Sequence, residues 1–516
     1  MHEAFASLLN SAAGAVLIKI LKAVFLAVLS IGVVSMAVTA KPKRGTTSFT
    51  LLRIIFAVAF VAVLCYQAYW QLLGFSHPKF ARFLRRYNRR ANAAEIQVLR
   101  GPILDRRGRV LAAPVRGDIW ARRYPLGDAA AHPLGYYHCK YGITAVERVE
   151  DPLLSGYLPE SDEPPLSKRI LTPRAKEGKE VELNLDARLQ LFAYDQFQGR
   201  PGAAVVMNPR DGSLLALVSS PGFDPRHPQS AFTNTVTKCA FNRAVQGLYP
   251  PGSTFKPLVA GMAFDAGIKP VMDCPGSGYT PGPHTAPIRD SEYYAYARNG
   301  QVWPGWNNMN LKQAIVHSSN VYFARLGVQC GTERFNSMLA RAGLNAPVRY
   351  FAGSVGELKS VAGNAPAVEK PLQLAQPAIG QGRILVTPLH VACYTAAVAA
   401  DGKMPTPRLG AFDPPGEPVR LFSAAAAAYV RSAMREVVTS GTGKAANLRG
   451  LAICGKTGTA QVPGGKDHAW FTCFAPEKNP SLVVTVLVEH GGFGAKSALP
   501  IARDIMVEAQ KLGYVK

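Results

Sequence analysis

Acidic residues and clustered metal ligands are what this sequence has least of. Its 516 residues include 34 Asp or Glu against 58 Lys or Arg, which gives a formal net charge of +24. The eight cysteines are scattered, without a Cys-x-x-Cys pair or a Cys/His cluster, so the common zinc-binding patterns are absent. We therefore expect no metal and no other cofactor. Seven cysteines lie outside the apolar run that contains Cys65, so at least one thiol is unpaired.

The positive charge is concentrated directly after a hydrophobic stretch. Between Ser76 and Pro125, thirteen Lys or Arg stand against three acids, a net charge of +10 in fifty residues. A nucleic-acid patch and a basic segment at a membrane surface would both have this composition. The position next to an apolar run favours contact with anionic lipid headgroups, and we expect no nucleic acid as a partner.

Two uncharged apolar runs open the chain, at Ala23–Ala40 and Ile54–Phe75. Each is close to the roughly 20 residues that a membrane-spanning helix needs, so one or two transmembrane helices are expected in residues 1–76. A buried core helix is the alternative for each run. Val38-Thr39-Ala40 resembles a signal-peptidase site, but the second apolar run favours an uncleaved anchor.

The rest of the chain alternates between strand and helix patterns. Residues 100–112 predict two strands joined by a turn, and residues 203–219 predict a β-hairpin. Further strands are expected at 469–474 and 482–489. Helices are expected at 257–264, 311–326, 389–400 and 424–438. Strands at both ends with helices between them predict a mixed α/β (α+β) fold, in which helices cover a sheet.

Three short motifs follow one another in the second half of the chain. They are Ser253-Thr254-Phe255-Lys256, Ser318-Ser319-Asn320 and Lys456-Thr457-Gly458-Thr459. Each also has an ordinary structural interpretation, as a helix terminus, a helix N-cap or turn, and a glycine bulge on an edge strand. Ser76-His77-Pro78-Lys79 repeats the first pattern beside the apolar run. Only Ser253 is followed by an apolar helix and by the other two motifs, which favours a catalytic role.

The first motif can supply a nucleophile and its base. Pro250-Pro251-Gly252 breaks the chain and Ser253 then opens a helix, on which positions i and i+3 share a face. Lys256 can therefore reach the Ser253 hydroxyl, which needs an adjacent base. The amine must be neutral to act as that base. Burial and the positive charge of Lys456 are both expected to lower its pKa.

The second and third motifs can complete a cleft. Ser318 and Asn320 flank Ser319, so a hydroxyl that relays a proton and an amide that holds a substrate backbone can point the same way. Residues 456–459 follow an apolar run and predict a strand. A glycine there lets a substrate lie against the backbone, beside two threonine hydroxyls and a fixed positive charge. The motifs are separated widely enough for different elements to bring them together.

As an ordered set, these motifs resemble those of penicillin-binding proteins and serine β-lactamases. From about Arg100 onwards the chain is most similar to a class B penicillin-binding protein, a monofunctional peptidoglycan D,D-transpeptidase with a compact pedestal. The similarity extends to further segments, namely 100–108, 142–147, 202–212, 242–253, 379–389, 441–443 and 468–471. The paired apolar runs depart from the family pattern, in which one anchor is usual.

The resemblance implies three domains. Residues 1–76 would form the membrane anchor, residues 77–198 a basic juxtamembrane segment and small pedestal, and residues 199–516 the transpeptidase domain. That domain would have three layers, with a central antiparallel sheet and a helical lobe. It would lie on the extracytoplasmic side of the inner (plasma) membrane. The charge pattern conflicts with this orientation, because the segment after the second run is more basic than the loop before it.

The resemblance also implies a reaction and its residues. Ser253 would attack the D-Ala-D-Ala carbonyl of a stem peptide, and the amine of a neighbouring stem would resolve the acyl-enzyme. The catalytic residues would be Ser253, Lys256, Ser318, Asn320 and Lys456. Backbone N–H groups of Ser253 and Thr459 would form the oxyanion hole. The substrate carboxylate, which β-lactams imitate, would be held by Lys456, Thr457, Gly458 and Thr459. Expected partners are peptidoglycan stem peptides and a polytopic, SEDS-type glycan polymerase.

Three related activities stay open as alternatives. A D,D-carboxypeptidase would need only water in place of the acceptor amine. A β-lactamase would need a second base, and Glu333, Glu357 and Glu369 stand in no pattern that indicates one. A non-catalytic sensor or scaffold is the remaining alternative, although the complete motifs argue against a scaffold.

Overall fold

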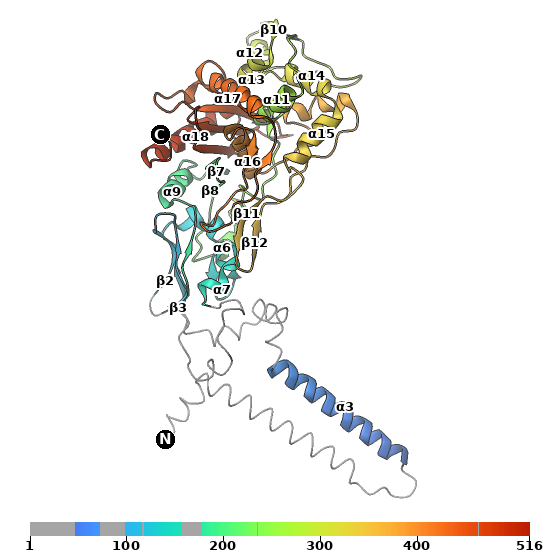
Figure 1. The fold of residues 1–516 in the computed structure, drawn as a ribbon, viewed down its shortest axis with the longest axis vertical. Coiled ribbons are helices and arrows are strands. Elements are labelled where there is room, and N and C mark those ends of the chain that lie inside the picture. The colour runs from blue at the N-terminus through green and yellow to red at the C-terminus, as the bar shows by residue number, and fades with distance from the viewer. Residues whose placement is uncertain are drawn as a thin grey trace. The chain divides into compact units, whose positions relative to one another are not determined.

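The computed structural model describes residues 47–72, 99–115, 118–156, 178–234, 236–462 and 464–515. The chain divides into two compact units, one made of Met1–Leu99 with Leu158–Glu177 and the other of Arg100–Tyr157 with Gly178–Lys516. In the first unit the described element is helix α3 (Thr47–Leu72), blue in Figure 1. A search of the described residues finds no helix that combines the length and the apolar character of a membrane span. The run Ala23–Ala40 and the second Ser-x-x-Lys pattern lie outside the described residues.

An antiparallel five-stranded sheet forms the centre of the second unit. Its strand order is β15–β16–β17–β7–β8, with bounds Cys454–Ala460, His468–Ala475, Leu482–Val488, Gly202–Met207 and Leu214–Ser220. The hairpin expected at 203–219 is confirmed as β7 and β8, and it pairs with the C-terminal strands through β17. Strands from residues 202–220 and 454–488, which are far apart in the sequence, thus form one sheet.

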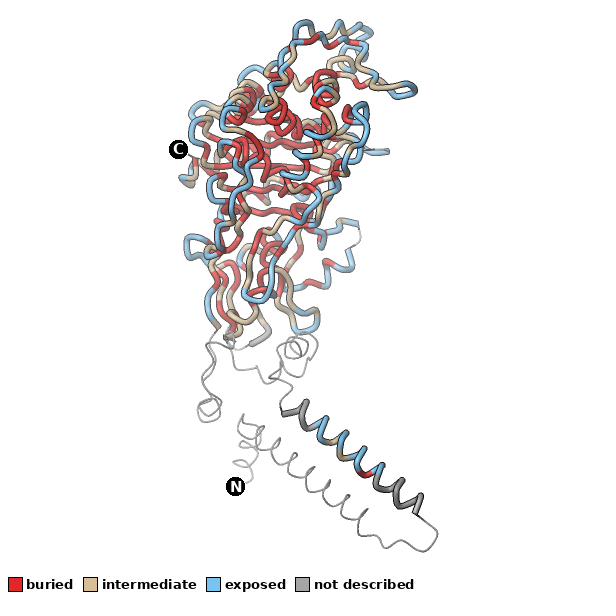
Figure 2. The backbone as a smooth tube through the Cα atoms, turned by 45° about the vertical axis from the view of Figure 1, so that its right-hand side comes forward, coloured by how far each residue is buried: buried red, intermediate tan, exposed pale blue. Residues whose placement is uncertain are grey.

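Helices cover both faces of this sheet (Figure 1). Helices α9 (Ala187–Asp195) and α18 (Gly494–Lys511) pack on one face, and α16 (Pro388–Ala399) packs on the other, with α17 (Ala424–Thr439) and α11 (Lys256–Asp265) beside it. A hydrophobic core lies on each face of the sheet, and alternate residues of β17 pack into one or the other. Val484 and Val486 face α18, whereas Val483 and Leu487 face the opposite side. The expected three-layer arrangement is therefore confirmed. Figure 2 shows the buried backbone concentrated in these layers.

In the helical lobe, one expected helix differs from the structure. The helix expected over 311–326 is two helices, α13 (Leu311–His317) and α14 (Asn320–Cys330). They separate because Ser318 has the left-handed backbone conformation, with φ 59°, and Ser319 then acts as the N-cap of α14. The lobe also contains α15, α12, β9 and β10, at Thr332–Arg341, Ser291–Arg298, Met272–Pro275 and Gly305–Met309.

The N-terminal part of the second unit is a small four-stranded sheet. Its order is β3–β2–β1–β6, with bounds Asp118–Arg123, Val110–Val115, Ile103–Leu104 and Val181–Glu182. The strand–turn–strand pattern expected at 100–112 is present as β1 and β2. Two short helices follow β5 in the sequence, α6 (Ala145–Val149) and α7 (Asp151–Leu154), which are separate because Glu150 leaves the helical conformation.

The remaining elements are short. They are β4 (Tyr137–His138), β5 (Gly142–Ile143), α5 (Ala131–Leu134), α10 (Gln229–Thr233), β11 (Arg349–Gly353), β12 (Gly356–Lys359), β13 (Lys403–Met404), β14 (Val419–Arg420) and five 3-10 turns of three or four residues among the described residues, of which η5 (Gly252–Phe255) matters below. All eight cysteines are free thiols, which fits the expectation that at least one is unpaired.

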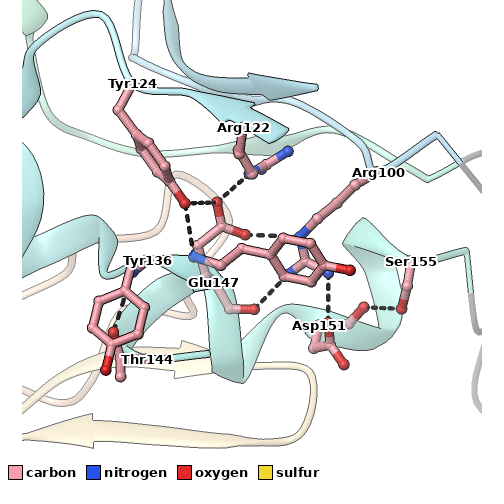
Figure 3. A network of polar contacts seen from close by, with 9 residues as sticks. Arg100, Arg122, Tyr124, Tyr136, Thr144, Glu147, Asp151 and Ser155 are labelled. Carbon is pink, nitrogen blue, oxygen red and sulfur yellow. Dashed lines mark hydrogen bonds and ion pairs between the residues drawn. The ribbon is translucent and has the colours of Figure 1, made fainter. Parts of the chain in front are cut away.

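A buried carboxylate holds the small four-stranded sheet to α6 (Figure 3). Glu147 Oε2 accepts a hydrogen bond of 2.8 Å from Arg100 Nε, and Glu147 Oε1 accepts from Arg122 Nε and, at 3.2 Å, from Tyr124. Arg100 also pairs with Asp151 at 2.5 Å. Burial by itself raises the pKa of Glu147, but the charges of Arg122 and Arg100 outweigh it and lower the pKa below its usual range.

Candidate active site

The segment that carries Ser253 is a tight turn pressed against strand β15. Ser253 lies in η5, and α11 begins only at Lys256, so the serine precedes the α-helix instead of opening it. Gly252 has φ 54°, and a Cβ there would lie 2.8 Å from the carbonyl oxygen of Thr459. Its N–H donates to the carbonyl oxygen of Gly380 at 2.8 Å. Only glycine satisfies both the positive φ and this close approach.

Lys256 is fully buried and reaches the second motif. Its Nζ donates to the carbonyl oxygen of Ser318 at 2.6 Å and to Oδ1 of Asn320 at 2.7 Å. It also lies 3.3 Å from the hydroxyl of Ser318. A hydrogen bond to the hydroxyl of Ser253 is not among the described contacts of this amine. The described contacts of this amine therefore join it to the turn between α13 and α14.

Lys456, from β15, approaches the same serine from the other side. Its Nζ donates to the hydroxyl of Ser318 at 2.7 Å and to the carbonyl oxygen of Thr457 at 3.1 Å. The hydroxyl of Ser318 thus lies between two buried amines that come from the first and third motifs. The three motifs meet in space, as expected from their order in the sequence.

The electrostatics of the two lysines favour a neutral amine. Burial lowers the pKa of Lys256 to about 7, against the opposing influence of Asp290 and Glu292. Burial also lowers the pKa of Lys456 well below its usual range, and the charge of Lys256 lowers it further. Because like charges repel, a proton on one of these two amines disfavours a proton on the other. Within the described part of the chain, no carboxylate lies within ion-pair distance of either amine.

The third motif lies on the edge strand of the sheet, and its pairing with β16 is unbroken from Cys454 to Ala460. The interpretation of Gly458 as a bulge is therefore wrong. A Cβ at Gly458 would lie 2.9 Å from side-chain atoms of both Thr254 and Trp470. The glycine is thus required for the Ser253 turn to pack on β15, in addition to any approach of a substrate.

Two further contacts around the site had no recognisable signal in the sequence. The hydroxyls of Thr442 and Thr457 lie 2.8 Å apart, so the loop after α17 supports the third motif. Asp290, which precedes α12, accepts hydrogen bonds from Ser319 and Asn320 in the second motif. These partners are far apart in the sequence, and neither contact could be inferred from local spacing.

A third contact supports the chain that leads into Ser253. The hydroxyl of Tyr249 donates to Glu489 Oε1 at 2.6 Å, and Arg243 pairs with the other carboxylate oxygen at 3.0 Å. Tyr249 also exchanges two backbone hydrogen bonds with Val386. The residues before the nucleophile turn are therefore fixed at the end of β17.

Comparison with known proteins agrees with this geometry. Residues 202–507 match the family described as the penicillin binding protein transpeptidase domain. The chain belongs to this family. Residues 100–181 of the transpeptidase chain also match the penicillin binding protein A dimerisation domain.

Named relatives and solved structures support the same membership. Peptidoglycan D,D-transpeptidase PbpA of Mycolicibacterium smegmatis is 31% identical, over 79% of this chain and 88% of that protein. Peptidoglycan D,D-transpeptidase MrdA of Haemophilus influenzae is 30% identical, over 75% and 68%. The penicillin G acyl-enzyme complex of penicillin-binding protein A from M. tuberculosis superposes with a TM-score of 0.68 at 29% identity, covering 80% of this chain and 99% of that one.

Proposed function

We propose that this chain is a peptidoglycan D,D-transpeptidase that crosslinks stem peptides through an acyl-enzyme on Ser253. The single observation that carries the proposal is the hydroxyl of Ser318 held between the buried amines of Lys256 and Lys456, beside the Ser253 turn. The named relatives and the acyl-enzyme structure support the reaction class. β-Lactams acylate the same serine.

Acylation begins with proton transfer from Ser253. Neutral Lys256 accepts the hydroxyl proton as Ser253 Oγ attacks the carbonyl carbon of the penultimate D-Ala. A pKa of about 7 leaves much of this amine unprotonated near neutral pH. The hydroxyl of Ser318 then passes a proton to the leaving nitrogen, and the terminal D-Ala departs. The amine of a second stem peptide attacks the ester carbonyl and releases Ser253, so one amide bond breaks and one forms.

The remaining motif residues bind the substrate and the developing charge. The backbone N–H groups of Ser253 and Thr459 stabilise the oxyanion, a contribution of about 10²–10³ in rate for each donor in comparable sites. Asn320 orients the substrate backbone. Lys456, Thr457, Gly458 and Thr459 hold the terminal carboxylate along the outer edge of β15, the last strand of the sheet. The carboxylate favours the charged form of Lys456 and so opposes the burial that lowers the pKa of this amine.

The N-terminal part of the chain is proposed to hold the enzyme at the inner membrane, with the catalytic unit on the extracytoplasmic side. The apolar run Ile54–Phe75 supports an anchor, and in the described part of α3 the side chains of Ile55, Phe56 and Val58 are more than half exposed. A polytopic glycan polymerase of the SEDS type is the proposed membrane partner. The PbpA and MrdA names of the relatives are consistent with such a partner.

A product assay separates transpeptidation from hydrolysis. The full-length chain is incubated with a stem pentapeptide and an excess of a labelled D-amino acid, and products are separated by mass. The transpeptidase is expected to exchange the terminal D-Ala for the labelled residue, and Ser253→Ala is expected to form no product. A tetrapeptide without exchange would contradict the proposal in favour of a D,D-carboxypeptidase.

A further inference from the structure

Asp290 is a buried residue whose carboxylate accepts hydrogen bonds from the start of α14, although Asp290 itself precedes α12. It stands at the N-cap position of α12 but makes no side-chain capping bond there. Its Oδ1 instead accepts from the backbone N–H groups of Asn320, at 2.5 Å, and Val321, at 3.0 Å. Both of its oxygens accept from the hydroxyl of Ser319, at 3.1 and 2.9 Å.

These contacts give α14 a second cap. Ser319 is the N-cap residue of α14, because its hydroxyl accepts a hydrogen bond of 3.1 Å from the N–H of Tyr322. Asp290 adds a negative charge at the same end of this eleven-residue helix, where unpaired N–H groups and the helix dipole favour an anion. The carboxylate is 3% exposed, and among the described residues no cation lies within ion-pair distance of it. Its charge is satisfied by hydrogen bonds to this one turn.

The turn that Asp290 grips is the one that positions Lys256. The carbonyl oxygen of Ser318 and the amide oxygen of Asn320 both accept from the amine of Lys256. The amide nitrogen of Asn320 donates to the carbonyl oxygen of Arg289 at 2.9 Å, which fixes the orientation of this side chain. Residues 289 and 290 therefore hold Asn320 by its backbone and by its side chain.

We infer that Asp290 is a positioning residue of this active site, which clamps the Ser318–Asn320 turn so that Ser318 and Asn320 meet the amine of Lys256. The inference rests on the proposed function, because it concerns the same acylation step. Ser318 needs such a clamp, since a non-glycine residue in the left-handed conformation is strained and persists only where its surroundings fix it.

The charge of Asp290 gives the clamp a signature that a purely structural contact lacks. Asp290 raises the pKa of Lys256 and so works against burial. Replacing the carboxylate by a neutral amide removes this influence, and the pKa of Lys256 falls. Because the neutral amine is the active form, the acidic limb of the acylation rate moves to lower pH.

The test compares Asp290→Asn with Asp273→Asn in the full-length chain. Asp273 is an exposed carboxylate on β9 of the same lobe, which accepts from the N–H of Asn308 at 2.8 Å and touches none of the motifs. The second-order rate of acylation by a fluorescent penicillin is measured from acidic to alkaline pH. Each rate is expressed per molecule that labels at completion, so unfolded protein does not enter it.

For Asp290→Asn we expect a rate roughly ten- to a hundredfold lower on the alkaline plateau, because the amine is misplaced, and an acidic limb at lower pH. Asp273→Asn is expected to match the wild type. An unchanged rate, or a lower rate with an unmoved limb, overturns the inference. If Asp290→Asn does not fold, Ser319→Ala removes one of the donors, and an unchanged rate in that variant overturns it. A wild type that does not label would contradict the proposed function instead.

Discussion

Two of the groups of buried charges among the described residues are compensated in opposite ways. In the small N-terminal sheet, Glu147 is fully buried between Arg100 and Arg122, and the two guanidinium groups keep it ionised. At the candidate active site, Lys256 and Lys456 are just as buried, but both contact the hydroxyl of Ser318. Among the described residues, no carboxylate lies within ion-pair distance of either amine. The first arrangement favours the charged state, and the second favours loss of a proton.

This difference separates a structural charge from a chemical one. A buried ion pair with complementary partners holds elements together, and its removal mainly costs stability. Two buried amines do not compensate each other's charge, and the pKa of about 7 of Lys256 suits the base proposed for Ser253. A pKa that is shifted toward the neutral form, more than burial itself, therefore distinguishes the candidate active site.

The largest expected effect is the loss of the acyl-enzyme in Ser253→Ala. Without the Ser253 hydroxyl no ester can form, so labelling with fluorescent penicillin is expected to disappear. Ser76→Ala is the matched control, because Ser76 heads the second Ser-x-x-Lys pattern of the sequence. It is expected to label like the wild type. A labelled Ser253→Ala protein would place the nucleophile elsewhere.

Lys256→Met removes the base while keeping an unbranched side chain of similar length. A positioned general base contributes about 10²–10⁴ in rate, so acylation by penicillin is expected to slow by that factor. The measurement is the second-order acylation rate on the alkaline plateau. A loss of less than tenfold would mean that Lys256 is not the base.

Glu147→Gln breaks the other side of the comparison. It leaves the buried guanidinium group of Arg122 without a counter-charge and Arg100 with Asp151 alone, which is expected to lower the free energy of unfolding by about 3–5 kcal/mol. Urea denaturation measures this loss. Acylation per labelled molecule is expected to stay unchanged at low temperature, where the protein remains folded. A slower acylation would show that the contacts of Glu147 also act on the candidate active site.

Acidification distinguishes the two groups without a mutation. Lys256 must be neutral to act, so acylation is expected to fall about tenfold for each pH unit below 7. The stabilising contribution of Glu147 is present above its unfolded pKa of about 4.5 and is lost only as the pH falls through its lower folded pKa. Between pH 7 and 5 the rate should therefore drop while the Glu147 pairing keeps stabilising the fold. A flat rate profile would contradict the assignment of Lys256.

The smallest expected effect belongs to Thr442→Val, which removes a hydroxyl 2.8 Å from that of Thr457. A single neutral hydrogen bond is worth about 0.5–1.5 kcal/mol, so acylation should slow by no more than about tenfold. Thr439→Val is a control at an exposed hydroxyl of α17. If both variants behave like the wild type, Thr442 does not support the third motif.

The sequence was sufficient to predict the elements whose residues are close together along the chain. The hairpin of β7 and β8 has its turn residues and its alternation in one stretch, and Lys256 follows Ser253 by three residues. The convergence of the three motifs was predictable from family resemblance, although neither the Ser318 turn nor the partners of each amine could be derived. The left-handed conformation of Ser318 depends on packing that spacing does not encode.

Contacts between distant residues account for what was not predicted. Asp290 caps a helix thirty residues further on, and Glu489 holds Tyr249 across 240 residues. No periodicity links such pairs.

The most direct test is to locate the acyl group. The full-length protein is treated with penicillin and digested, and the modified peptide is sequenced by mass spectrometry. The account predicts one adduct per molecule, on the hydroxyl of Ser253, in wild type and in Ser76→Ala. An adduct on Ser318 or on any other residue would contradict the assignment of the nucleophile, and with it the roles given to both buried lysines.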